Sequence, residues 1–568
     1  MGGFLEIIFK IILKYLLPAA LALFFYVFFV EPQIKFSHKI PTIPFWVGFL
    51  PFFDTNTDQR EIWFKYIEPK ISKAGIAKIY FAGRWNLIVS DPEYMNQLLK
   101  NEQKIYRKSG NNVKIPKSLL SYYTGTNIIS AHGKQWKKFR NIILPGLLNF
   151  CNYHIIFKNS TLFCNLIKTS INSSNNGIKE KNDSIYLLKP NTLSESLNIV
   201  SDSTSFSQCN SHITIDDSTH SSNAKNYSKT AYYSIQISEF VQRLSLANIS
   251  EIALGFNIKT LEERNSVLYN DLNKIKKEIF KPLFMAFPFL DNLPINSRKN
   301  TRRSIRSFKE SLFLLVQQNL IANYKYEQET YLNPAANLIK NHKNGILTKD
   351  ELLDNLAILL IAGHENPQLL LTSLIYILGK YKEEQDNLRS ELLALNIESY
   401  DTNTKLQMLS QSKKLNSLLY ETIRLYPPIG QLVNRKTLQN CYMTSSVRPP
   451  IFIKKGTYIG YNNFGIQRSI SIWGKNANDF KPNRWGSSIE EINDQWKKRK
   501  SAAEISAFHG GNRNCIGESI ALNSMRITIW EMVKSFEWQL SEEWREKFTS
   551  AGPICPLNLS IKVKNICN

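Results

Sequence analysis

The stretch Phe508-His-Gly-Gly511-Asn-Arg513-Asn-Cys515-Ile-Gly517 places a single cysteine in a glycine-rich turn near the end of the 568-residue chain. Apolar residues with helical spacing follow over residues 518–538, so Cys515 is predicted to lie at the N-terminal side of a helix. Unpaired backbone N–H groups and the helix dipole favour a thiolate at such a position. Gly511 and Gly517 would let the backbone turn tightly and pass close to a flat ligand.

Five fixed positions of this stretch, Phe508, Gly511, Arg513, Cys515 and Gly517, match the haem-binding loop of the cytochrome P450 family, which the stretch resembles. The resemblance implies that haem b is the cofactor and that Cys515 is the axial ligand of its iron. It also implies that Phe508 covers the sulfur and that Arg513 binds a haem propionate. A thiolate ligand pushes electron density onto the iron and favours cleavage of the O–O bond. The alternative is a buried structural cysteine beside a glycine turn.

A second stretch predicts a long central helix. Thr348-Lys-Asp-Glu351 is a capping box, in which a hydroxyl and a carboxylate satisfy backbone donors at a helix start. The helical pattern continues to about Gly379 and is apolar on most faces, which is typical of a helix in the centre of a large domain. In its middle, Ala362 and Gly363 are small enough for the flat cofactor to approach the backbone. Pro367 lacks an N–H, so the helix is predicted to open locally.

The residues just before this proline bear on the reaction. Members of the family usually have an acidic residue followed by a threonine here, and the resemblance implies that this pair delivers protons to bound oxygen. Glu365 fits the acidic position, whereas Asn366 replaces the threonine, so proton delivery would need Glu365, an amide or water. The run Ala362-Gly-His-Glu-Asn-Pro-Gln368 is similar to that of the fungal spore-wall members that couple N-formyltyrosine into dityrosine. That chemistry abstracts a hydrogen atom from each ring. Alternatively, Glu365 and Asn366 merely satisfy the kink.

Two further motifs match the parts of the family that bind the haem propionates. Trp136 and Arg140 are four residues apart and share one helical face. The resemblance implies that the indole N–H and the guanidinium both donate to the propionates. Arg435 follows a proline turn and matches another propionate-binding arginine of the family.

Three charged residues match the family's support for the haem loop. Glu421 and Arg424 lie at i and i+3 of a helix predicted over residues 414–426, so they share a face and can pair. With the prolines that follow, they resemble the Glu-x-x-Arg helix of the family, in which the pair is buried. Arg484, within residues 480–485, resembles the arginine that completes this cluster. All these motifs occur in the order found in the family.

The chain is predicted to consist of an N-terminal membrane signal-anchor, residues 1–30, and a catalytic domain, residues 31–568. Residues 11–30 are almost all apolar and numerous enough to cross a bilayer as a helix. The proline segment 40–48 is predicted to end that helix. Residues 169–228 are rich in Asn, Ser and Lys and are predicted to be a disordered insertion. Resemblance to microsomal members implies a single-pass anchor in the endoplasmic reticulum membrane and a cytosolic catalytic domain.

The composition bears on compartment and partners. Seven cysteines without framework spacing indicate a reduced compartment. The net charge of +24 is dispersed, and no finger or helix-turn-helix signature accompanies it, so no nucleic-acid partner is expected. Such a charge suits an anionic membrane surface or an acidic redox partner. The resemblance implies NADPH–cytochrome P450 reductase as that partner, so NADPH acts indirectly.

We therefore expect a mainly α fold with small β-sheets, the cytochrome P450 fold, with an N-terminal transmembrane helix. The expected function is a haem-thiolate oxidase that uses O2 and reductase-supplied electrons on a small molecule, with a tyrosine derivative preferred. One alternative is a sterol or fatty-acid monooxygenase, and another is a non-catalytic membrane haem sensor or carrier. The apolar residues 280–290, with two prolines, form either a buried loop or a membrane-dipping entrance loop.

Overall fold

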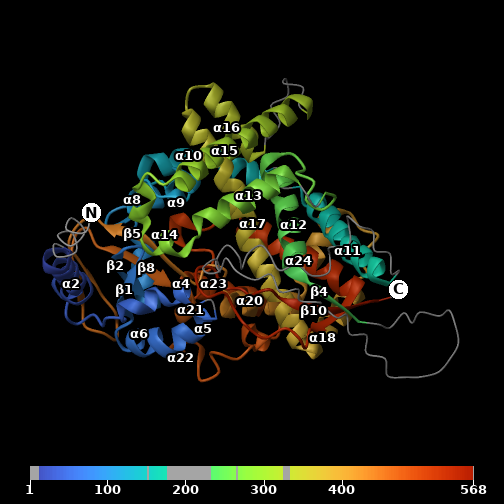
Figure 1. The fold of residues 1–568 in the computed structure, drawn as a ribbon. Helices are drawn as coiled ribbons and strands as arrows, with labels where there is room; N and C mark the ends of the chain where they lie inside the picture. Colours follow the sequence, from blue (N-terminus) through green and yellow to red (C-terminus); the bar gives the residue numbers. More distant parts are fainter. Residues whose placement is uncertain are drawn as a thin grey trace.

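The computed structural model describes residues 12–54, 56–149, 152–175, 232–263, 266–323 and 333–566. Helices make up most of it and are accompanied by small sheets, as predicted (Figure 1). The longest helices are α10 (Gly133–Asn149), α11 (Tyr153–Asn175), α12 (Ile237–Ile249), α13 (Val267–Ile279), α15 (Asn296–Asn323), α17 (Lys349–Lys380), α18 (Lys382–Ala394), α20 (Lys413–Leu425), α23 (Ile489–Ser501) and α24 (Glu518–Ser535). Shorter ones include α2 (Leu17–Phe25), α7 (Pro92–Lys100), α8 (Asn111–Lys114), α9 (Leu119–Thr124), α14 (Pro282–Ala286), α16 (Pro334–Lys343) and α19 (Thr402–Gln411).

The described strands form three sheets, with the orders β1-β2-β8-β5-β3, β4-β10-β9 and β6-β7. Their bounds are β1 (Ile76–Phe81), β2 (Arg84–Val89), β3 (Tyr106–Lys108), β4 (Tyr233–Gln236), β5 (Gln431–Thr437), β6 (Cys441–Met443), β7 (Ile451–Ile453), β8 (Tyr458–Asn462), β9 (Phe536–Leu540) and β10 (Ser560–Asn565). Figure 1 shows the largest sheet at the same end of the molecule as α2. Its antiparallel pair β3–β5 places Lys108 opposite Arg435.

The central helix is α17, and it begins as predicted. The Thr348 hydroxyl accepts a hydrogen bond from the N–H of Glu351 at 3.2 Å, and the Glu351 carboxylate accepts one from the N–H of Thr348 at 3.1 Å. Most side chains of α17 are buried, and the helix passes through the middle of the molecule (Figure 1). It is continuous across Pro367, so the predicted opening is limited to the one backbone hydrogen bond that proline cannot donate.

A glycine in α17 permits close packing against α12. A Cβ atom at Gly363 would lie 2.2 Å from Cγ1 of Ile249, so the isoleucine side chain would have to move. From the sequence, Gly363 is predicted only to let the flat cofactor approach the helix backbone. In the structure, Gly363 also sets the distance between two helices.

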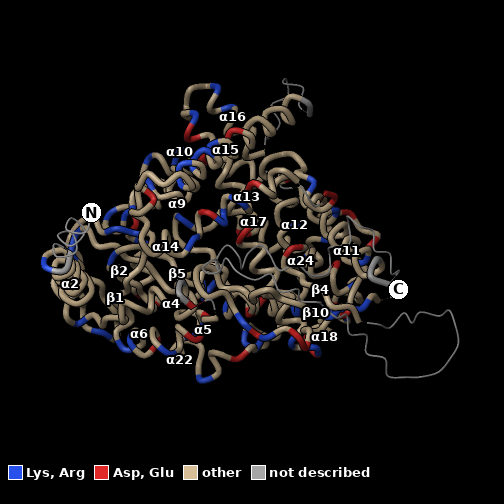
Figure 2. Tube along the Cα trace, in the orientation of Figure 1, with Lys and Arg blue, Asp and Glu red and all other residues tan. Residues whose placement is uncertain are grey.

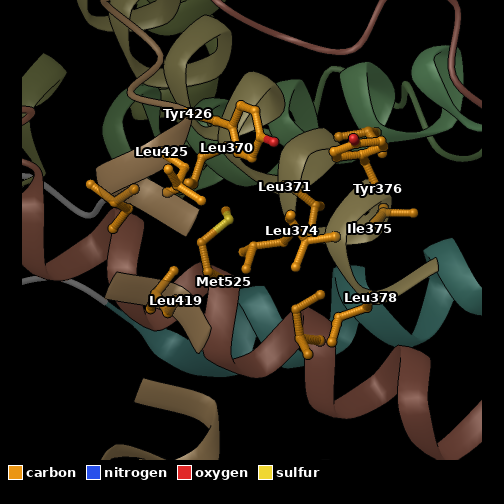
Figure 3. Packing of buried hydrophobic residues seen from close by; sticks show 14 of the residues in the cluster. Leu370, Leu371, Leu374, Ile375, Tyr376, Leu378, Leu419, Leu425, Tyr426 and Met525 are labelled. Carbon is orange, nitrogen blue, oxygen red and sulfur yellow. The ribbon is translucent and has the colours of Figure 1, made fainter. Parts of the chain in front are cut away.

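A hydrophobic cluster holds α17 against α20 and α24. Figure 3 shows Leu370 and Leu374 of α17 close to Leu419 of α20 and Met525 of α24, and all four side chains are buried. Burying each such side chain contributes about 1.5–3 kcal/mol. The cluster thereby fixes the helix that follows Cys515 against the central helix.

The N-terminal helix is longer than predicted. Residues 14–35 form one helical run, which contains an 18-residue window of mean hydropathy 1.7 and is long and apolar enough to cross a membrane. It ends at Lys35, before the proline segment. Its inner end touches the domain, because Nε1 of Trp85 donates to the carbonyl of Val27 at 2.8 Å. Phe28 also packs against Tyr80, with ring centres 4.8 Å apart. The boundary predicted at residue 30 therefore falls within a continuous helix. Residues 1–11 lie outside the described part.

Two predicted element boundaries are wrong. The helix after Cys515 ends at Ser535, and Trp538 lies in β9, where alternate side chains are buried. Helix α11 extends to Asn175, so residues 169–175 of the predicted insertion are helical because the helix continues to pack, with Ile171 fully buried. Residues 176–228 lie outside the described part.

The apolar segment 280–290 is neither wholly buried nor wholly exposed. It folds into α14 and a 3-10 helix at Pro288–Asn292, and both prolines are buried. Leu283 and Phe289 are 54% and 62% exposed. Phe287 stacks on Phe49, with ring centres 5.6 Å apart, so the segment lies against the chain that follows the N-terminal helix.

Basic residues are spread over many elements, as the sequence indicates (Figure 2). The four described cysteines, Cys164, Cys441, Cys515 and Cys555, are all free thiols. Cys515 differs from the two fully buried ones because its side chain is accessible, which directs attention to the space it faces.

Candidate active site around Cys515

A cavity of about 300 Å3 lies between α10, α12, α17, α24 and the loop that carries Cys515, and its wall is mostly apolar. Many residues singled out from the sequence line it: Trp136, Arg140, Ala362, Gly363, Asn366, Phe508, Arg513, Cys515 and Gly517. Arg435, Glu365 and Gly511 are close in sequence to the wall but do not belong to it. The fold therefore collects at one cavity residues that are hundreds of positions apart.

The loop around Cys515 is closed by one backbone hydrogen bond, from the N–H of Cys515 to the carbonyl of Phe508 at 2.9 Å. Gly511 has a φ of +59°, a left-handed conformation that favours glycine. Gly517 has an ordinary φ of −99°, but a Cβ atom there would lie 4.0 Å from the sulfur. Burial raises the pKa of the Cys515 thiol, while the Gly517 N–H acts in the opposite direction. A thiolate here therefore needs a cation beside it, such as an iron ion.

Two buried basic side chains, one in the wall of this cavity and one beside it, form no ion pair among the described residues. Lys108, 5% exposed, lines the cavity beside Arg435, which is 1% exposed. Nη1 of Arg435 donates to the side chain of Asn434 at 2.8 Å, but its Nε is buried without a partner. Burial, with the charges of Arg435 and Arg513, lowers the pKa of Lys108 well below its usual value. The charge of Glu102 acts on both side chains, but this carboxylate is already paired with Arg513. The two basic side chains and the accessible sulfur therefore fit a haem, whose two propionates are anions.

Arg513 already has an anionic partner, the buried side chain of Glu102. Its Nε lies 2.8 Å from Oε1 of Glu102, and its Nη2 donates to the carbonyl of Ala131 at 2.8 Å. The guanidinium is also 4.2 Å from the ring centre of Trp136. Arg513 therefore holds the cysteine loop to the segment before α10.

Arg140 also contacts the cysteine loop, because its Nη2 donates to the side chain of Asn514 at 3.1 Å. Sequence reasoning identified Trp136, Arg140 and Arg513 but missed Glu102 and Lys108. Neither belongs to a motif with local spacing, and each is recognised only through a partner far away in the chain. The one feature of the sequence that could have pointed to Lys108 is its position at the end of a short strand.

Glu421 accepts hydrogen bonds from four groups in a buried cluster. Its two carboxylate oxygens lie 2.8 and 2.9 Å from Nη2 and Nε of Arg424, and Glu421 and Arg424 are both fully buried. Nε of Arg484, the backbone N–H of Lys481 and Nε1 of Trp485 donate at 2.9, 2.9 and 3.1 Å. The three charged residues predicted to form this cluster are therefore brought together, with every carboxylate oxygen satisfied.

Glu365 points away from the cavity that its neighbour Asn366 lines. Its carboxylate lies 2.7 Å from Nζ of Lys276 in α13, and Lys276 is 5% exposed whereas Glu365 is 30% exposed. Burial raises the pKa of Glu365, but the Lys276 ammonium outweighs it and leaves the pKa below its usual value. The pair therefore holds an accessible, ionised carboxylate one residue from the cavity wall.

The buried side chain of His364 contacts the lysine of this pair. Its Nδ1 lies 2.7 Å from the carbonyl of Leu360, which can only accept, so Nδ1 carries the proton. Nε2 is then the acceptor for the Lys276 ammonium at 3.2 Å. Burial, with the charge of Lys276, lowers the pKa of His364 to about 4, so this histidine is neutral at physiological pH.

The comparisons with known proteins agree with this geometry. A profile of the cytochrome P450 family matches residues 211–564. The chain is 40% identical over 534 residues to cytochrome P450-DIT2 of Saccharomyces cerevisiae, which covers 94% of each chain. It is 27% identical over 551 residues to the cytochrome P450 monooxygenase xanG of Aspergillus fumigatus, covering 95% of this chain and 89% of the other. It is also 26% identical over 336 residues to the cytokinin hydroxylase of Arabidopsis thaliana, covering 58% of this chain and 60% of the other.

Both the profile match and the similarity over nearly the full length of the yeast protein extend well beyond the cysteine loop. They include the central helix, the Glu421 cluster and the strand that carries Arg435. The family implies a haem bound through a cysteine thiolate, which is the group that the cavity fits. This chain therefore belongs to the cytochrome P450 family of oxidative enzymes.

Proposed function

We propose that this enzyme couples two molecules of N-formyltyrosine through their rings, giving bisformyl dityrosine for a fungal spore wall. The observation that carries the proposal is Asn366 at the cavity wall, within the run Ala362–Gln368 that resembles the spore-wall members of the family. The 40% identity with cytochrome P450-DIT2, over 94% of both chains, supports it along the chain.

The reaction balances with the expected partners. Two phenols each lose one hydrogen atom and one carbon–carbon bond forms between the rings. The two hydrogen atoms, two electrons from NADPH and two protons reduce O2 to two molecules of water. We propose NADPH–cytochrome P450 reductase as the electron donor and the endoplasmic reticulum membrane as the location, with the helix over residues 14–35 as the anchor.

Haem b, when bound, supplies the oxidising chemistry, with Cys515 as its axial ligand. We assign Lys108 and Arg435 to its propionates because both are buried beside the cysteine loop and Nε of Arg435 has no hydrogen-bond partner. We also assign Trp136 and Arg140 of α10 to the propionates, and Phe508 to covering the sulfur, since all three line the cavity. Arg513 takes part through its hold on the loop, since Glu102 already neutralises it.

The proposal is tested by supplying the purified enzyme with reductase, NADPH and N-formyltyrosine and measuring the fluorescent dimer by chromatography. We expect dimer formation that depends on NADPH and O2. A sterol and a medium-chain fatty acid are assayed in parallel, because the partly exposed apolar segment 280–290 would also suit a lipid substrate. A hydroxylated lipid without any dimer would reject the proposal in favour of a lipid monooxygenase.

The pair Lys276–Glu365 gives a second prediction. We assign Glu365 to moving protons toward the cavity through Asn366, with Lys276 as a positioning residue. Replacing Glu365 by glutamine should lower turnover about 100-fold, the usual lower contribution of a general acid or base. Lys276→Met should also slow turnover and raise the solvent deuterium isotope effect. Without the Lys276 ammonium, burial would raise the pKa of Glu365 and disfavour its ionised form.

Lys309→Met is the matched control, since Lys309 forms a similar buried pair with Asp354 of the same helix at 2.6 Å, away from the cavity. It should lower stability but leave the isotope effect unchanged. If Lys276→Met behaves like Lys309→Met, the pair is only structural and Glu365 has no part in proton movement.

A further inference from the structure

The wall of the haem cavity is mostly apolar, yet two of its polar side chains, Asn248 of α12 and Thr528 of α24, contact the same part of α11. Oδ1 of Asn248 accepts a hydrogen bond from Nδ2 of Asn159 at 3.1 Å, and the hydroxyls of Thr528 and Ser160 lie 2.9 Å apart. Asn159 and Ser160 are neighbours in the chain, and both are 0% exposed. The cavity therefore has a polar corner that continues into the buried face of α11.

The polar contacts continue from this corner to solvent. Nδ2 of Asn159 also donates to Oε1 of Glu251 at 3.1 Å, and Oε2 of Glu251 lies 2.6 Å from Nζ of Lys158. The side chains of Glu251 and Lys158 are 13% and 40% exposed. Figure 1 shows α11 on the outside of α12, which packs against both α11 and α17. Four polar side chains, Lys158, Glu251, Asn159 and Asn248, therefore form a polar line from the surface to the haem cavity.

One atom in the middle of the polar line has no hydrogen-bond partner among the described residues. Both N–H bonds of Asn159 are used, toward Asn248 and Glu251, whereas its Oδ1 is buried and unpaired. Buried polar groups are nearly always hydrogen-bonded, either to protein or to ordered water. A water molecule suits a polar, buried position of this kind, because it donates to Oδ1 and keeps further hydrogen bonds for its other neighbours.

The inner end of the polar line lies beside the proline turn of α17. The side chain of Ile249, the residue after Asn248, packs on Gly363, where a Cβ atom would lie 2.2 Å from its Cγ1. Asn366 follows Gly363 by about one helical turn, and both asparagines line the cavity. Glu365 instead pairs with a lysine of α13. The polar line and Glu365 therefore link this part of α17 to different neighbouring helices.

We propose that the polar line brings protons from solvent to the haem cavity, as a second route beside Glu365. The carboxyl group of Glu251 releases a proton to water held by Asn159 and Asn248, and the resulting carboxylate takes up another proton from solvent. The proton ends in one of the water molecules that the reduction of O2 forms. Oxidation of any substrate by this enzyme requires that reduction, so the inference does not depend on the coupling of N-formyltyrosine.

The test compares Glu251→Gln with the wild type and repeats the comparison in Glu365→Gln. Glutamine keeps an acceptor oxygen for Asn159 but has no proton to release at neutral pH. While Glu365 is present, Glu251→Gln should slow the reduction of O2 to water by less than about 2-fold. In Glu365→Gln it should slow it about 10-fold or more, and the solvent deuterium isotope effect should rise, as expected for loss of a general acid.

The assay contains reductase, NADPH and whichever of N-formyltyrosine and a medium-chain fatty acid the enzyme oxidises. O2 consumed and hydrogen peroxide released are both measured, and their difference gives the O2 reduced to water. Glu262→Gln is the matched control, because Glu262 accepts from the Asn257 amide at 2.9 Å at the surface. It should behave as the unchanged residue in both backgrounds.

Asn159→Leu tests the middle of the polar line without changing a charge. It should act like Glu251→Gln in both backgrounds. A crystal structure of the wild-type enzyme should show a water molecule on Oδ1 of Asn159, and its absence would overturn the proposal.

Equal rates with glutamate and glutamine at residue 251 in both backgrounds would also overturn it. So would an equal loss in both backgrounds with an unchanged isotope effect, because Glu251 would then only support the fold. If Glu365→Gln alone has no effect, while Glu251→Gln lowers the rate and raises the isotope effect, the polar line is the main route and the role given to Glu365 fails.

Discussion

Replacing Cys515 by alanine is expected to remove the thiolate spectrum of the reduced, carbon-monoxide-bound protein and to reduce turnover to that of the reaction without enzyme. Cys515 is the one described cysteine at the haem cavity, and the methyl group of alanine cannot donate to iron. The loss should be complete because no other described cysteine lines the cavity. The measurements are the absorption spectrum after reduction with carbon monoxide, and dimer formation.

Cys441→Ala is the matched control. Cys441 is a free, half-buried thiol in a two-stranded sheet, where its sulfur lies 3.7 Å from the hydroxyl of Tyr106. This variant should keep both the spectrum and the activity. Retention of the thiolate spectrum in Cys515→Ala would remove the ligand assignment, and with it the roles given to the surrounding cavity.

Glu421→Ala should destabilise the fold by about 3–5 kcal/mol, the usual cost of removing one partner of a buried ion pair. The fully buried Arg424 would lose both carboxylate contacts, and Arg484 and Trp485 would each lose an acceptor. Since native proteins are stable by only about 5–15 kcal/mol, the variant should fail to retain haem. Denaturant unfolding and the haem-to-protein ratio measure both effects.

Glu310→Ala provides the comparison, because Glu310 forms an exposed pair with Arg306 at 3.0 Å. Exposed helical pairs contribute about 0.3–0.5 kcal/mol, so this variant should unfold almost as the wild type does. Equal unfolding midpoints for the Glu310 and Glu421 variants would show that the buried cluster does not support the haem loop.

Local chemistry explains why much of this protein could be predicted from its sequence. The capping box at Thr348, the Glu421–Arg424 pair and the glycine-rich turn before Cys515 are all set by residues within a few positions of each other. Each motif has a characteristic number of residues between its members, which can be recognised in the sequence without knowing the fold. The structure places the first two as predicted.

Contacts between distant segments could not be predicted. Lys276 reaches Glu365, and Glu102 reaches Arg513, only after whole helices have packed together. No spacing in the sequence identifies such partners. The sequence therefore predicts a role for Glu365 at bound oxygen but does not indicate its contact with Lys276.

The end of α24 was mispredicted for another reason. Phe536-Glu-Trp538-Gln-Leu540 alternates apolar and polar residues, but the apolar positions also continue the helical pattern before them. Packing decides between the two, since Trp538 and Leu540 lie against Gly379 at the end of α17. A Cβ atom at Gly379 would lie 3.2 Å from each of these side chains, so a larger residue would force them to move.

The contact between Val27 and Trp85 bears on how a soluble form of the enzyme should be designed. Cutting the chain after residue 30 would take away the acceptor of a fully buried indole and uncover the ring of Tyr80. Truncation would then change the folded domain itself, and not merely release it from lipid. A version that begins before Val27 and replaces only the outward-facing leucines and phenylalanines of the preceding turns would keep that junction whole.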